Sequence, residues 1–132
     1  MKSLMIKPFD NAGASQLKCI HIFGNGGQKK IALGSILKVV VKKTSQTKIK
    51  RFKKVKKVIR KKKYKSVIVN SKSPTARPDG SFIKFLDTSA VLLSDKNKVI
   101  GSRVKGVVPF EVKKNILSLK FKKIFRCARF II

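Results

Sequence analysis

The sequence predicts a small, mainly β protein of the barrel or sandwich type. Four short runs rich in β-branched and aliphatic residues are separated by turn residues or charged stretches, and strands at such intervals are typical of these architectures. The length of 132 residues and the hydrophobic share of 42% suit one folded domain, because a chain of about this size buries roughly two thirds of its unfolded surface. We therefore expect a packed core rather than a disordered basic chain.

The expected strands are apolar on one or both faces and cover residues 17–23, 36–42, 66–70 and 90–94. In the first of them Leu17, Cys19, His21 and Phe23 alternate with the other residues and share one face. The later runs are apolar on both sides, as expected of strands in a small closed sheet.

Turn chemistry predicts a hairpin between residues 76 and 87. Pro78-Asp79-Gly80 supplies a fixed φ, a turn-forming side chain and a position that tolerates positive φ. A second turn is expected at 94–98. Pro109 can open a short helix at 109–114, because proline suits the first turn of a helix. The segment 116–125 is apolar and basic, and we expect a strand there.

The net charge restricts the possible functions more than any motif does. The 34 Lys and Arg against 5 Asp and Glu give a formal charge of +29, which requires a polyanionic partner. Most of these cations are Lys, a compact point charge that suits phosphate better than base edges. The segment 48–65 holds 12 cations and no acid, with apolar residues at roughly helical spacing. We expect it to dock on the body and to order when phosphate neutralises it.

The sequence contains few residues suited to catalysis or to metal binding, so we expect no enzyme, no catalytic residue, no metal site and no cofactor. His21 is the only histidine, and Cys19 and Cys127 have no neighbours at metal-ligand spacing and are expected to be free thiols. The glycines at 24–27 lack the ending of a nucleotide-binding loop and are better read as a turn that brings Lys29 and Lys30 to nucleic-acid backbone. No stretch reaches about 18 apolar residues, so we expect no membrane span. A small β core with scattered Lys fits recognition of folded RNA by shape, phosphate and 2′-hydroxyl groups.

Four motifs occur in order along the chain. They are D-N-A-G-A at 10–14 followed by Cys19-Ile20, R-P-D-G-S-F-I-K-F at 77–85 continuing to D-T-S-A-V-L-L at 87–93, G-S-R-V-K-G-V-V at 101–108, and I-L-S-L at 116–119. Their order and spacing resemble the family of the fourteenth protein of the large ribosomal subunit, in its bacterial and organellar form. The chain departs from that pattern at Leu86, in a basic insertion at about 44–63, and in a basic extension at 120–132.

The resemblance implies a single domain over residues 1–119, built as a five-stranded β-barrel with a projecting β-hairpin and a short helical C-terminal region. It implies a structural role in the large ribosomal subunit and contacts with large-subunit rRNA, with neighbouring ribosomal proteins and, across an intersubunit bridge, with small-subunit rRNA; no homo-oligomer is expected. The region 101–103 and the helix near Glu111 would lie toward the bridge. A general nucleic-acid-compacting protein is the alternative that the charge alone allows.

Residue types, positions and the resemblance together give one set of candidate RNA-binding residues. They are Asn11, Lys29, Lys30, Lys53, Lys54, Lys56, Lys57, Lys61, Arg77, Lys84, Arg103 and Lys105. The richness in Lys, Ile and Phe resembles the product of an A/T-biased gene, and the N-terminus lacks the pattern of an import presequence. We therefore expect a protein of the mitochondrial ribosome, with a plastid or the bacterial cytoplasm as alternatives.

Overall fold

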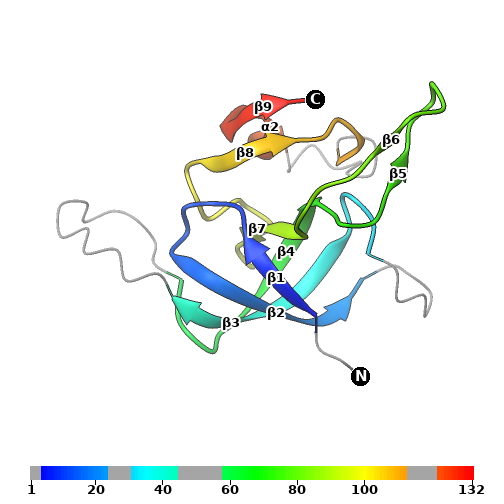
Figure 1. The fold of residues 1–132 in the computed structure, drawn as a ribbon. Coiled ribbons are helices and arrows are strands. Elements are labelled where there is room, and N and C mark those ends of the chain that lie inside the picture. The colour runs from blue at the N-terminus through cyan, green and yellow to red at the C-terminus, as the bar shows by residue number, and fades with distance from the viewer. Residues whose placement is uncertain (1–3, 24–30, 45–57, 113–121) are drawn as a thin grey trace.

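A closed five-stranded barrel forms the body of the protein (Figure 1). The computed structural model describes residues 4–23, 31–44, 58–112 and 122–132. The barrel strands are β1 (Met5–Pro8), β2 (Ala14–Ile22), β3 (Ile36–Thr44), β4 (Lys63–Asn70) and β7 (Ser89–Leu93). Their order is β1-β2-β3-β4-β7, and the barrel closes where β1 pairs parallel with β7. The predicted barrel is confirmed.

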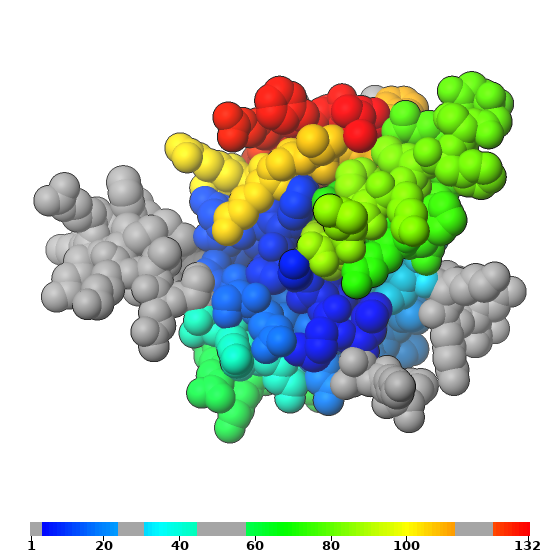
Figure 2. Space-filling model, viewed as in Figure 1, coloured from blue at the N-terminus to red at the C-terminus, as the bar shows by residue number. Residues whose placement is uncertain are grey.

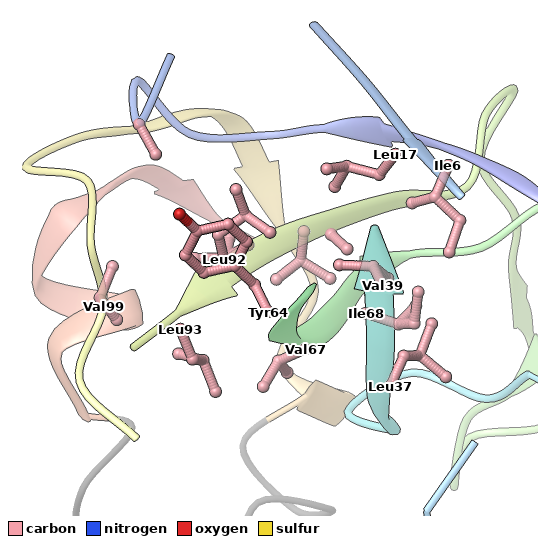
Figure 3. Close-up of a cluster of buried hydrophobic side chains, with 14 of the residues drawn as sticks. Ile6, Leu17, Leu37, Val39, Tyr64, Val67, Ile68, Leu92, Leu93 and Val99 are labelled. Carbon is pink, nitrogen blue, oxygen red and sulfur yellow. The ribbon is translucent and has the colours of Figure 1, made fainter. Parts of the chain in front are cut away.

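The core explains why the sequence runs in β3, β4 and β7 are apolar. Leu37, Val39, Ile68 and Leu92 have no exposed surface, and all five residues of β7 are buried. Figure 3 shows the side chains of Leu37, Val39 and Ile68 lying together in this buried cluster. Ile124, from outside the barrel, belongs to the same cluster. Because a second layer covers part of the barrel, strands beneath that layer are apolar on both faces.

A β-bulge in β2 changes which residues face the core. The pairing with β3 shifts between Cys19 and His21, and an extra residue in one strand turns the following side chains to the opposite face. Ile22 therefore packs against the core, whereas His21 and Phe23 are exposed, with ring centroids 5.0 Å apart. The expectation that Leu17, Cys19, His21 and Phe23 share one face is wrong beyond Cys19.

The predicted hairpin is present as β5 (Thr75–Ala76) and β6 (Phe82–Ile83), which project from the barrel (Figure 1). Gly80 has a φ of 85°, and the carboxylate of Asp79 accepts hydrogen bonds from both the main-chain N–H and the hydroxyl of Ser81. The second predicted turn is also present, because Ser94 N–H donates to the carbonyl of Lys98 over 2.8 Å.

The C-terminal part forms a layer above the barrel from β8 (Val104–Val108), α2 (Lys122–Cys127) and β9 (Ala128–Ile131). A helix begins at Glu111, as expected from Pro109. The expected strand at 116–125 is wrong from Lys122 onward, where the chain is helical, and its first part lies outside the described residues. Ile124 is buried in the core, and Phe125 of the same helix and Ala128 at the start of β9 pack against it.

The basic segment 48–65 is described only from residue 58 onward. Residues 45–57 lie outside the described part of the chain, so the expected docking of their apolar stripe stays a prediction. Lys63 and the residues after it belong to β4, where the helical spacing gives way to a strand. Val58 is buried and its N–H donates to the carbonyl of Ala12, whereas Ile59 is 61% exposed.

Candidate nucleic-acid interface

The predicted RNA-binding residues fall into two groups. Lys29, Lys30, Lys53, Lys54, Lys56 and Lys57 lie outside the described residues. Of the others, Lys61, Lys84, Arg103 and Lys105 are exposed cations. The side chains of Asn11 and Arg77 instead make hydrogen bonds or ion pairs within the protein.

Asn11 fixes the loop that carries Arg103. Its side-chain oxygen accepts hydrogen bonds from the main-chain N–H groups of Ser102 and Arg103, over 2.8 and 3.1 Å, and its amide nitrogen donates to the Ser102 hydroxyl over 2.8 Å. A Cβ atom at Gly101 would lie 2.7 Å from that same oxygen, so the close approach requires glycine. Asn11 is therefore a positioning residue for the loop in this structure.

Arg103 and Lys105 form a pair of cations on one side of the C-terminal layer. Both are exposed and they flank the buried Val104, because alternate residues of an extended chain point the same way. The main-chain N–H of Lys105 donates to the carbonyl of Phe9 over 2.7 Å, which ties this edge of β8 to the barrel. Two positive charges are thus presented from a rigid support, which suits contact with adjacent phosphates.

Asp10 lies buried beneath this pair, at 2% exposure. Its carboxylate accepts hydrogen bonds from the N–H groups of Leu92 and Ala12, over 3.1 and 3.4 Å. Burial raises the pKa of Asp10 to about 6, because removal of water disfavours the charged form more than these bonds and the charge of Lys105 favour it. The carboxyl group anchors the chain at 10–12 to β7 and so supports the loop at 101–103.

Arg77 joins the base of the hairpin to the C-terminal layer. Its Nε lies 2.8 Å from Oε1 of Glu111, and the two side chains are only 28% and 12% exposed. Its terminal nitrogen also donates to the main-chain oxygen of Ile132 over 3.2 Å. The guanidinium group is therefore engaged inside the protein, and Lys84 is the exposed cation on the hairpin side.

A basic groove of about 500 Å³ was not predicted from the sequence. Lys7, Lys43 and Lys72 line it, from segments far apart in the chain, together with Asp87. The Nζ of Lys7 lies 2.7 Å from the Asp87 carboxylate, and this hydrogen bond lowers the pKa of Asp87 below its ordinary value. No local pattern marks these lysines, because only closure of the barrel between β1 and β7 brings them together.

The described part of the chain contains no cluster of three or more His, Cys, Asp or Glu residues that could hold a metal ion. Within the same residues, no helix has both the length and the apolar character needed to cross a membrane.

Comparison with known proteins agrees with the fold and the motifs. The family described as "Ribosomal protein L14p/L23e" matches residues 1–132, which is the whole chain. The chain belongs to this family of ribosomal proteins. It is also similar to the large ribosomal subunit protein uL14 of Carsonella ruddii (strain PV), with 37% identity over 129 residues that span 96% of this chain and 94% of the relative. The resemblance drawn from the four motifs is confirmed.

Proposed function

We propose that the chain is a non-catalytic structural constituent of the large ribosomal subunit that binds large-subunit rRNA through phosphates and helix shape. The observation that carries this proposal is the exposed pair Arg103 and Lys105, held rigidly by Asn11 and by the barrel of a family of ribosomal proteins. Contacts from Lys61, Lys84 and the basic insertion at 44–63 are part of the same proposal. RNA recognised by shape and backbone needs such fixed cations rather than stacking aromatic residues.

Neutralising the pair is expected to lower the salt dependence of rRNA binding. Each phosphate contact contributes slightly less than one unit to the slope of log K against log salt, so Arg103→Gln with Lys105→Gln should reduce it by roughly 1.5 to 2. Binding to purified large-subunit rRNA across a salt series measures the slope. Lys96→Gln with Lys98→Gln is the matched control, because it removes two exposed charges from the 94–98 turn.

The same measurement separates the proposal from general nucleic-acid compaction, which the charge of +29 would also support. A compacting protein depends on total charge, so both double variants would lower the slope equally, and random duplex DNA would bind as well as rRNA at every salt concentration. That result would contradict the ribosomal role. A preference for rRNA that only the Arg103/Lys105 variant loses would support it.

A role in the intersubunit bridge is the finer part of the proposal. Arg103 stands on an exposed loop whose shape depends on Asn11, so Arg103→Ala should remove one cation without disturbing the support. We expect this variant to impair joining of the two ribosomal subunits more than assembly of the large one. Sedimentation profiles of reconstituted subunits measure both steps, and normal joining would argue against a bridge contact by Arg103.

Location in the mitochondrial ribosome is likewise a proposal, supported by the richness of the chain in Lys, Ile and Phe. The uL14 relative described above is bacterial, which fits a protein of bacterial and organellar type. Sucrose-gradient fractionation of the source mitochondria, with the chain followed by mass spectrometry, tests this location. The chain should sediment with the large subunit.

A further inference from the structure

The C-terminal strand β9 exposes apolar side chains that phosphate binding does not explain. Phe130, Ile131 and Ile132 are 57%, 49% and 52% exposed, and the neighbouring Phe110 is 46% exposed. Figure 2 shows the residues of this segment, in red, on the outer surface above β8. Contiguous apolar side chains on the surface of a strongly charged protein mark a site of interaction.

The hydrogen bonds of β9 show which of its edges is occupied. Ile132 N–H donates to the carbonyl of Val108, and the Ile132 oxygen accepts from the N–H of Phe110, so both main-chain groups of Ile132 face β8. In a strand these directions alternate from residue to residue. The main-chain groups of Phe130, which is paired with Val107, therefore also face β8, and those of Arg129 and Ile131 face the opposite edge.

That opposite edge carries no further strand within the described residues, since the sheet consists of β8 and β9 alone. The far edge of β8 is bonded to Phe9, so among the described residues the outer edge of β9 is the open side of this sheet. Arg129, at the start of this edge, is the only charged residue of the strand. An exposed apolar edge with few charges is a template for the addition of another strand.

We propose that the outer edge of β9 binds an extended segment of a neighbouring protein of the large subunit as an additional β-strand. The segment would bond to the main-chain groups of Arg129 and Ile131, cover Phe130 and Ile131 with apolar side chains, and place an acidic residue near Arg126 and Arg129. A second copy of this chain is excluded as the occupant by repulsion between two charges of +29. RNA is disfavoured because carbonyl oxygens alternate with the N–H groups along this edge and repel phosphate, and because Phe130, Ile131 and Ile132 are apolar and exposed there.

Hydrogen exchange distinguishes strand addition from simple burial. In the free chain the amides of Phe130 and Ile132 should be protected by β8, whereas those of Arg129 and Ile131 should exchange quickly. In purified large subunits the Arg129 and Ile131 amides should slow by at least tenfold. Exchange of these two amides at the free-chain rate in assembled subunits would overturn the inference.

A matched pair of proline variants tests the direction of the main-chain groups. Ile131→Pro removes an N–H that faces the open edge, so the chain should fold and enter subunits while the Arg129 amide loses its added protection. Phe130→Pro removes an N–H that faces β8 and should instead loosen β9 in the free chain. Unchanged protection of Arg129 in subunits that contain Ile131→Pro would contradict strand addition.

A photoreactive benzoyl-phenylalanine at position 130 identifies the class of partner in intact subunits. Linkage to one segment of a large-subunit protein, lost with Ile131→Pro, supports the proposal, and linkage to rRNA alone overturns it. The identification of the partner as a large-subunit protein rests on the proposed function. Sedimentation distinguishes failure of that function from failure of strand addition alone. A chain absent from large subunits overturns the ribosomal role and this partner together, whereas a chain present there with fast Arg129 exchange overturns only the strand addition.

Discussion

The Asp10→Asn variant is expected to be about 2 kcal/mol more stable than the unchanged chain at pH 7.5 and nearly equal to it at pH 4. Burial raises the pKa of Asp10 from 3.8 to about 6. One pKa unit corresponds to about 1.4 kcal/mol, so the ionised carboxylate costs the folded state roughly 3 kcal/mol. Asparagine keeps an oxygen for the Leu92 N–H, and loss of the longer bond from Ala12 offsets about 1 kcal/mol.

The sign of this pH dependence follows from proton binding. A raised pKa means that the folded state binds the Asp10 proton more tightly than the unfolded state does. The contribution of Asp10 to the free energy of unfolding is therefore largest below pH 3.8, falls as the pH rises to about 6, and is constant above that value. Urea unfolding at a series of pH values measures the difference between the two chains. A stability difference that does not change between pH 4 and pH 7.5 would contradict the assignment.

Asp79 provides a control with the opposite sign. It is exposed, and the hydrogen bonds from Ser81 hold its pKa below the ordinary value. Its contribution is present at neutral pH and is lost as the pH falls through its lowered pKa. Asp79→Asn should therefore be less stable than the unchanged chain at neutral pH, and the difference should shrink in acid.

The local sequence was sufficient to predict a strand that buries both of its faces. The runs that became β4 and β7 are apolar because the barrel interior and the C-terminal layer cover them. In β3 only one face is buried, and Lys38 and Lys42 are exposed on the other. The local sequence was insufficient for β1, whose sequence Met5–Pro8 has no alternating pattern. This segment is a strand because it closes the barrel between β2 and β7, which is a property of the whole sheet.

In the candidate site, too, some residues could be identified from the local sequence and others could not. The sequence identified Arg103 and Lys105 as surface cations, since an unpaired charge is rarely buried. It could not show that the Asn11 side chain holds the loop of Arg103, because these residues are 92 positions apart. Lys7, Lys43 and Lys72 were missed for the same reason. These lysines are neighbours because the barrel closes, and their spacing along the sequence does not indicate it.

Arg77 was predicted as an RNA-binding residue of the hairpin, and its ion pair with Glu111 gives it an effect on stability that the sequence did not indicate. Arg77→Met is expected to lower the free energy of unfolding by about 2–3 kcal/mol. The substitution keeps the apolar stem but leaves the Glu111 carboxylate, 12% exposed, without its cation. Removal of one partner from a fully buried pair costs about 3–5 kcal/mol, and partial exposure of Arg77 reduces that value.

A double-mutant cycle tests the pair directly. Glu111→Gln should cost less than Arg77→Met, because the guanidinium group keeps its bond to the Ile132 oxygen and is 28% exposed. The double variant should be more stable than the sum of the single losses predicts, by at least 1 kcal/mol. Urea unfolding measures all four chains. Additive losses would show that the two side chains do not stabilise each other.

Lys84→Met is the matched control on the same side of the hairpin, since Lys84 is exposed. Its stability should change by less than about 0.5 kcal/mol. The salt dependence of rRNA binding then assigns the role of each cation. Loss of Lys84 should lower the slope by roughly one if it contacts a phosphate, and loss of Arg77 should leave the slope unchanged while Glu111 holds its guanidinium group. An equal fall for both variants would mean that Arg77 leaves Glu111 to bind RNA.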